Sequence, residues 1–204
     1  MVRPRFAKLP EAQQQAILSA ALDEFAAHGF HDASLNRVID AAGISKGSMY
    51  YYFDGKEDLY IHVARVELER LLGRLGPFPI PAQADPDVFW STLEGFYLRL
   101  MSALAASPQL AALIRGWLAA SNTALQQAQQ ELGQVALPWI EEALDAGQRI
   151  GAVRTDLPAG LLIAVVVGMG QAMDTWLVTR DPDAEALPPL VHALIDMIRG
   201  ALRP

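Results

Sequence analysis

A chain of 204 residues, 52% of them hydrophobic, is long enough to bury a substantial core as one domain or as a small domain joined to a larger one. The absence of cysteine excludes disulfides, a thiol nucleophile and a thiolate metal site, and it suits a reducing cytoplasm. Residues 1–56 hold six basic and six acidic side chains, so residues 57–204 account for the whole net charge of −7. A nucleic-acid partner is therefore not excluded for the N-terminal part.

The N-terminus is basic, with Arg3, Arg5 and Lys8 ahead of the first predicted helix. No apolar stretch follows these residues, so we expect no secretory signal. Such an arm can enter a DNA minor groove, or it can contribute only diffuse charge, and the residues leave both alternatives open.

The Ala- and Leu-rich composition favours an all-α fold, and the first part of the chain predicts three helices. The first covers about 10–28 and stops at Gly29, and the second covers 34–42 and stops at Gly43. A third, 45–53, follows directly, with Ser45 as a candidate N-cap. Because only Gly43 and Ile44 separate the last two helices, they must cross steeply, which is the geometry of a helix-turn-helix.

In the third helix, Met49 and Phe53 are spaced to face inward, which leaves Lys46 and three consecutive tyrosines, residues 50–52, facing largely outward. Three exposed aromatic rings in one turn are unfavourable on a surface without a partner. Against DNA, phenol hydroxyls and the ammonium group reach phosphates, and the small Gly47 lets the helix approach base edges. The alternative is a surface helix that carries aromatic residues by chance.

The run from Ser34 to Leu59, SLNRVIDAAGISKGSMYYYFDGKEDL, resembles the DNA-binding signature of TetR-family regulators. The resemblance covers roughly residues 1–60, and the rest of the chain agrees only in layout. It implies a three-helix DNA-binding head, residues 1–56, followed by a larger helical ligand-binding and dimerisation body, residues 57–204.

The same resemblance implies which residues meet DNA. Lys46, Gly47, Ser48 and Tyr50 would approach bases, whereas Ser34, Tyr51, Tyr52 and Lys56 would hold phosphates. Met49, Phe53, Ala42 and Leu59 would be packing residues. Ser45 belongs to the same surface, and Arg37 would either touch the DNA backbone or remain solvated.

The body is predicted to contain a helix at 56–75, a proline-rich loop at 76–87, and five further helices. These five cover about 87–106, 108–119, 121–150, 157–180 and 188–202. The apolar run 157–170 is interrupted by Pro158 and three glycines, so we expect a buried helix that is too short to span a membrane.

A head of this size reads only half of an operator, so the resemblance implies that the body pairs two heads as a homodimer. The last two helices are the natural surface, because each is apolar on more than one side and a two-fold copy would complete a four-helix bundle. The alternative, internal core, can hold at the same time. The expected dimer residues are Leu161, Leu162, Val165, Val166, Met169, Leu190, Leu194, Ile195 and Ile198.

Aromatic side chains of the body suggest a cavity for an apolar or aromatic ligand. In the helix at 87–106 they form one stripe with an acid and a thioether. The expected ligand-binding residues are Trp90, Glu94, Tyr97, Met101, Trp117, Trp139, Met173 and Trp176. If Glu94 lies inside the cavity it would favour a cationic or hydrogen-bonding ligand; core packing, or a solvated Glu94, is the alternative.

These features predict a cytoplasmic, ligand-responsive transcriptional regulator without cofactor, metal or catalytic residues. We expect a repressor that a small apolar or aromatic effector releases from a palindromic double-stranded DNA operator. An enzyme is disfavoured because no catalytic fingerprint occurs and because the nearest histidine pair, His28 and His31, flanks the helix stop at Gly29. A helical protein-interaction module without specific DNA binding is the other alternative.

Overall fold

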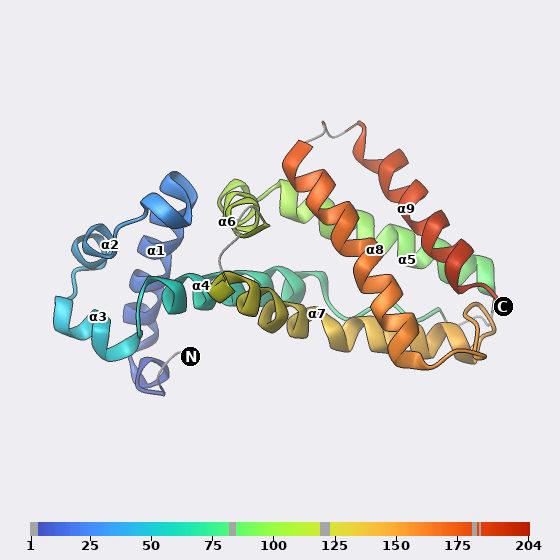
Figure 1. Cartoon of the computed structure of the whole chain (residues 1–204), viewed down its shortest axis with the longest axis horizontal. Coiled ribbons are helices and arrows are strands. Elements are labelled where there is room, and N and C mark those ends of the chain that lie inside the picture. Colours follow the sequence, from blue (N-terminus) through green and yellow to red (C-terminus); the bar gives the residue numbers. More distant parts are fainter. Residues whose placement is uncertain (1–3, 82–84, 119–122, 181–182, 184) are drawn as a thin grey trace. The chain divides into compact units, whose positions relative to one another are not determined.

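The computed structural model describes residues 4–81, 85–118, 123–180, 183 and 185–204, without the side chains of residues 117–118, 123–134 and 178. Every regular element in these ranges is a helix, which confirms the all-α fold (Figure 1). In chain order they are η1 (Phe6–Lys8), α1 (Glu11–Asp32), α2 (Leu35–Ala42), α3 (Lys46–Tyr52), α4 (Lys56–Leu75), α5 (Pro86–Ala105), α6 (Pro108–Leu118), α7 (Thr123–Arg149), α8 (Ala159–Arg180) and α9 (Leu187–Leu202).

The chain forms two compact units. The first comprises residues 1–70 and 107–135, and the second comprises 71–106 and 136–204. The predicted boundary after residue 56 falls at the first residue of α4, inside the first unit. It stays a prediction about where the DNA-binding part ends.

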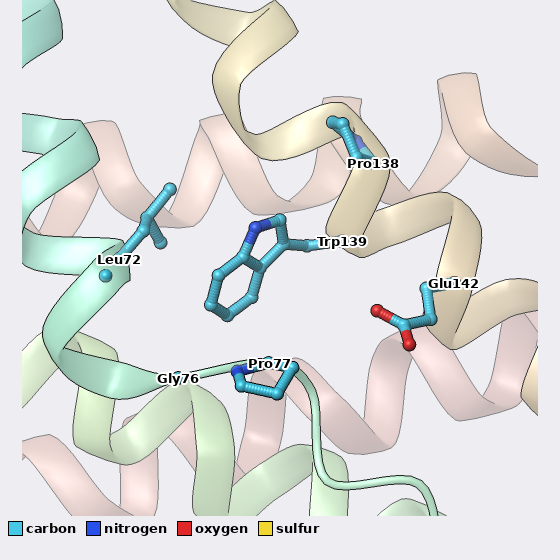
Figure 2. Close-up of a pocket in the computed structure, with 7 residues that line it drawn as sticks. Leu72, Gly76, Pro77, Pro138, Trp139 and Glu142 are labelled. Carbon is cyan, nitrogen blue, oxygen red and sulfur yellow. The ribbon is translucent and has the colours of Figure 1, made fainter.

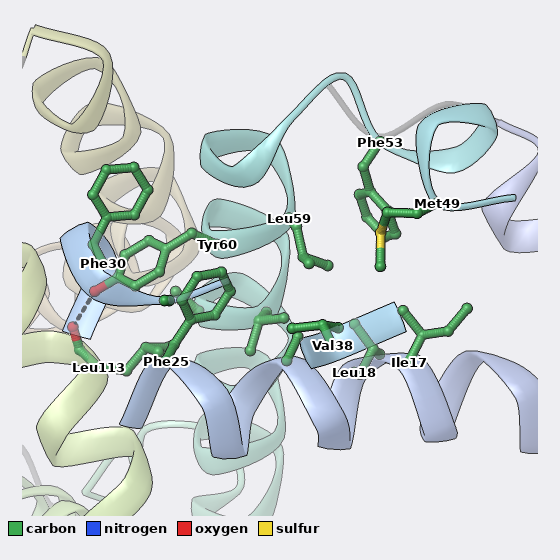
Figure 3. Close-up of a cluster of buried hydrophobic side chains, with 14 of the residues drawn as sticks. Ile17, Leu18, Phe25, Phe30, Val38, Met49, Phe53, Leu59, Tyr60 and Leu113 are labelled. Atoms are coloured by element: carbon green, nitrogen blue, oxygen red, sulfur yellow. Dashed lines mark hydrogen bonds between the residues drawn. The ribbon is translucent and has the colours of Figure 1, made fainter. Parts of the chain in front are cut away.

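The core of the first unit lies between α1, α2, α3, α4 and α6 (Figure 3). Ile17, Ala21 and Phe25 follow one another at helical spacing on α1 and are almost completely buried. Gly29 has a φ of 67°, which turns the chain so that Phe30 packs back into the same core. The stop predicted at Gly29 is thus a kink, after which helical residues continue to Asp32.

Gly43 ends α2 in the left-handed conformation, with a φ of 65°. Its amide donates to the carbonyls of Ile39 and Asp40, and the amide of Ile44 donates to Ile39 at 3.2 Å, which satisfies the end of the helix. A residue with a Cβ is strained at this φ, so the glycine permits the short turn into α3.

The second unit packs α5, α8 and α9 with the C-terminal part of α7, and in Figure 1 α9 lies beside α5 and α8. Gly147 allows the closest approach in this core. A Cβ there would stand 2.5 Å from Cγ2 of Val153 and 2.9 Å from the ring of Phe89. A larger residue at 147 would therefore push the end of α7 away from α5.

The helix predicted at 157–180 is present as α8, but the prediction that its apolar run 157–170 is buried and too short to span a membrane was wrong. The segment Ala159–Leu177 of α8 is 19 residues long with a mean hydropathy of 1.5, so by length and composition it could cross a membrane. Only 11% of it is buried within the chain. Pro158 precedes the helix, and Gly160, Gly168 and Gly170 are all accommodated inside it, so none of them shortens it. Much of its apolar surface is therefore exposed to solvent in the single chain.

Candidate nucleic-acid interface

Helix α3 is fixed by one polar cap and two buried side chains. The hydroxyl oxygen of Ser45 accepts the amide of Ser48 at 3.0 Å, which satisfies the first turn. Met49 and Phe53 are 0% and 1% exposed and anchor the inner side of the helix. Both were predicted from their spacing, and with them buried the opposite side of α3 must face outward.

The outward side carries the residues expected to meet DNA. Lys46 and Gly47 are exposed, and Tyr50 and Tyr51 keep 45% and 48% of their surface exposed. Tyr52 is half-buried against Phe6, with ring centres 6.1 Å apart. Donors of both kinds, ammonium and phenol, therefore stand on one short helix, an arrangement suited to phosphates and base edges.

The N-terminal arm is held against α3, a contact that the sequence did not indicate. Phe6 is buried between Tyr52, Phe53 and His62, and the guanidinium carbon of Arg5 lies 4.4 Å from the centre of the Tyr51 ring. The arm thereby adds a positive charge beside the exposed tyrosines. Arg3 lies outside the described residues.

Arg37 and Ser34 share one partner, the carboxylate of Glu24. The Nε of Arg37 donates to both Glu24 oxygens at 2.9 Å, and the amide of Ser34 donates to Oε1 at 2.7 Å. These bonds, the hydrogen bond from Arg37 first, lower the pKa of Glu24 despite its burial. Glu24 was missed because its partners become neighbours only after the chain turns at Gly29. A DNA contact by Arg37 or Ser34 stays a prediction.

Lys56 has a structural role beside its predicted contact with phosphate. Its Nζ donates to the carbonyls of His31 at 2.7 Å and Ala33 at 3.1 Å, and it lies 4.9 Å from the centre of the Phe30 ring. These contacts fasten the start of α4 to the end of α1.

The residues expected to form an effector cavity do not converge in one place. Trp90 and Met101 belong to the core of the second unit, Met173 is half-buried there, and Trp176 is 44% exposed. The side chain of Trp117 lies outside the described part. The expected ligand-binding residues thus include both core residues and surface residues. Their contact with a ligand stays a prediction.

Two polar members of that set are engaged with other helices. Oε2 of Glu94 lies 3.0 Å from Nδ1 of His192 on α9. The hydroxyl of Tyr97 donates to Oδ1 of Asp174, which links α5 to α8, and burial raises the pKa of both groups. These pairs hold the helices of the second unit together.

One member, Trp139, lines a groove of about 340 Å³ in the second unit (Figure 2). Its indole lies beside Leu72 and Pro77, with Pro138 and Glu142 of α7 on the other side. The groove combines an aromatic ring, aliphatic side chains and a single carboxylate.

The expected dimer residues divide between the interior and the surface. Leu162, Leu194, Ile195 and Ile198 are at most 5% exposed within the chain itself, so they are core residues and are not available to a partner. Val165, Val166, Met169 and Leu190 are half-buried, and Leu161 is 48% exposed. Among the described side chains of α8 and α9, the large exposed apolar residues are Leu161, Val167, Trp176 and Met197. Val167 and Met197 were not predicted for this surface.

The sequence profile of bacterial regulatory proteins of the tetR family matches residues 17–63, which run from α1 into α4. The HTH-type transcriptional repressor SCO4008 of Streptomyces coelicolor is 30% identical over 182 residues, 84% of this chain and 81% of that protein. The chain belongs to the TetR family of bacterial regulatory proteins.

Two further proteins are similar to this TetR-family chain, one in sequence and one in structure. The HTH-type transcriptional regulator RutR of Escherichia coli is 48% identical over 67 residues, a match that spans 33% of this chain and 32% of RutR. The structure of the fatty acid degradation regulator FadR from Bacillus halodurans aligns with a TM-score of 0.71 at 26% identity, covering 93% of this chain and 99% of FadR. The TetR fold therefore extends through both units.

Proposed function

We propose that this TetR-family protein is a cytoplasmic, ligand-responsive transcriptional repressor that binds a palindromic operator. One observation carries the proposal: Ser45, Met49 and Phe53 fix α3 so that Lys46, Tyr50 and Tyr51 face solvent. A helix held this way can enter a major groove as a rigid body. The family membership supports a regulator rather than an enzyme.

Binding to an inverted repeat next to the gene tests this proposal. The full chain should bind such DNA with nanomolar affinity at physiological salt, and the affinity should fall steeply as salt rises. Lys46→Ala should weaken binding and reduce the salt slope by about one, whereas Tyr50→Ala should weaken it with a smaller change in slope.

Arg203→Ala provides the matched control, since it removes one exposed positive charge close to the C-terminus. Its operator affinity should equal that of the wild type. If Lys46→Ala and Tyr50→Ala bind as tightly as the control, α3 is not the reading helix, and a protein-interaction module becomes the better interpretation.

The exposed apolar residues of α8 and α9 support a homodimer. Leu161, Val167 and Trp176 are spaced along α8, and Met197 of α9 is 53% exposed. Burying these side chains against a two-fold copy removes them from water and places two heads on two half-sites. The small residues Gly168 and Gly170 would let the two copies of α8 approach closely.

An effector is proposed to bind the groove at Trp139. Its lining suits a small aromatic or apolar molecule, and Glu142 would favour a molecule that also carries a hydrogen-bond donor. Leu72 and Gly73, which line the groove, belong to α4, and the first residue of that helix, Lys56, is fastened to α1. A ligand that displaces the end of α4 would therefore disturb the head and release the operator.

Thermal-shift screening of small aromatic compounds tests the effector proposal. A compound that binds should raise the melting temperature and weaken operator binding. Both effects should depend on the compound concentration in the same way. Trp139→Ala should abolish both effects, whereas Ile80→Ala, which changes an exposed apolar residue outside the groove, should keep them. An effector that acts equally on Trp139→Ala would place its site elsewhere.

A further inference from the structure

A second groove, of about 310 Å³, lies entirely within the first unit. It runs between the N-terminal arm, the start of α1 and the middle of α4. Phe6, Leu18 and Val66 give it an apolar wall, and Gln14 and Gln15 add amide groups at its edge. It is separate from the groove at Trp139, and no residue lines both.

The charged lining of this groove has one sign. Arg65 and Arg70 line it, and no aspartate or glutamate does. Arg70 forms an ion pair with Glu67, which lies outside the lining, at 2.5 Å. Arg65 has no carboxylate partner among the described residues; its Nη2 lies 3.0 Å from Nδ1 of His62. A guanidinium that faces only a neutral acceptor keeps donors available for an anion.

His62 adds a buried donor to the same lining. Arginine can only donate, so Nδ1 of His62 must accept from Arg65, and the proton of the neutral ring must reside on Nε2. The ring is 8% exposed, and burial lowers its pKa to about 4, which keeps it neutral. Within the described ranges Nε2 has no hydrogen-bond acceptor, and a buried N–H without an acceptor is destabilising.

We propose that this groove binds a small organic oxyanion, a carboxylate or phosphate ester on a compact apolar group. The oxyanion accepts from Arg65 and from Nε2 of His62, and the apolar group packs against Phe6 and Leu18. The groove thereby supplies donors without competing carboxylates, together with a wall that a fully hydrated ion would not use. This site does not depend on the proposed effector groove.

Titration calorimetry on the full-length protein tests the site with benzoate and phenyl phosphate as oxyanion probes, and with benzamide as a neutral molecule of nearly the same shape as benzoate. Both anions should bind about ten-fold more tightly than benzamide. Arg65→Gln and His62→Phe should each weaken benzoate by about ten-fold. Arg74→Gln, which neutralises another exposed arginine of α4 outside the lining, should leave benzoate binding unchanged.

A nitrogen NMR spectrum of the ¹⁵N-histidine-labelled protein gives a second readout. The Nε2 signal of His62, assigned by its loss in His62→Phe, should shift on addition of benzoate and not of benzamide. Arg65 is exposed, so Arg65→Gln remains decisive if His62→Phe does not fold.

Three outcomes would overturn the proposal. Equal binding of benzoate and benzamide would show that charge is not recognised, and equal losses in Arg65→Gln and Arg74→Gln would show diffuse attraction. The third outcome is displacement of benzoate by a scrambled oligonucleotide. If the oligonucleotide displaces benzoate as effectively as phenyl phosphate does at the same concentration of phosphate groups, the groove binds the DNA backbone instead.

Discussion

The hydroxyl of Tyr60 donates to the main-chain carbonyl of Leu113 across 2.5 Å and so joins α4 to α6 inside the first unit (Figure 3). Tyr60 is 2% exposed, and its ring packs edge-on against Phe25 and Phe30 at 4.9 and 5.3 Å. Burial raises the pKa of the phenol, so it remains a donor across the accessible pH range. Gly116 makes room for it, because a Cβ there would lie 3.3 Å from the hydroxyl oxygen.

Tyr60→Phe should therefore lower the free energy of unfolding by about 1 kcal/mol, because it removes one buried hydrogen bond and keeps the ring contacts. Urea denaturation of the full chain measures this loss. Tyr51→Phe, which removes an exposed hydroxyl, is the control and should change stability by less than about 0.5 kcal/mol. Equal stability of the two variants would mean that the bond between α4 and α6 contributes nothing.

Glu24→Gln should destabilise the first unit by about 1 kcal/mol at neutral pH, since it weakens the bonds to Arg37 and Ser34 while keeping the side-chain shape. The folded pKa of Glu24 is lowered, so its contribution is fully present above the ordinary value of 4.5 and is lost as pH falls through the lower folded value. The stability difference from the wild type should thus be present at neutral pH and shrink below about pH 4.5. Operator affinity should fall as well. A difference that grows on acidification would contradict this account.

His62 should make the wild type less stable as pH falls from about 6.5 to about 4. The unfolded chain takes up a proton on this imidazole in that window, and the folded chain, with a pKa of about 4, does not. The difference between 6.5 and 4 corresponds to a loss of about 3 kcal/mol. Denaturation of His62→Phe across this range should lack that part of the pH slope. An NMR titration that finds His62 protonating near its ordinary pKa would refute the prediction.

Val167→Glu and Met197→Glu should each convert the proposed dimer into monomers, because a carboxylate would be buried against its own copy. Sedimentation analysis measures the mass, and operator affinity should fall together with it. Ala105→Glu places the same charge on an exposed residue of α5 and should leave the dimer intact. Monomeric wild-type protein at micromolar concentration would remove the basis of the proposed dimer.

The head could be predicted in detail because its signals are local. Gly29 and Gly43 both adopt positive φ angles, and Ser45 caps α3 as expected. Spacing alone placed Met49 and Phe53 inward. Each of these predictions depends on residues within a turn or two of one another, where helical geometry fixes the neighbours.

The second unit was harder to predict, because α8 is apolar on all sides. Spacing cannot then separate Leu161, which is 48% exposed, from Leu162, which is 1% exposed. Trp90 and Trp139 were indistinguishable for the same reason, although one is core and the other lines a groove. The link from Tyr97 to Asp174 joins residues 77 positions apart, and no local pattern reveals such a pair.

The composition of the first unit has a consequence for protein engineering. Its core includes Leu59 and Val63 from α4 as well as Leu113 from α6, which the chain adds only after passing through α5. A DNA-binding cassette excised at residue 56 would lack all three and leave part of the apolar side of α1 in water. Transplanting this DNA specificity onto another regulator therefore requires grafting α6 along with the N-terminal helices. The recipient must receive two separate segments of the chain, because together they form one core.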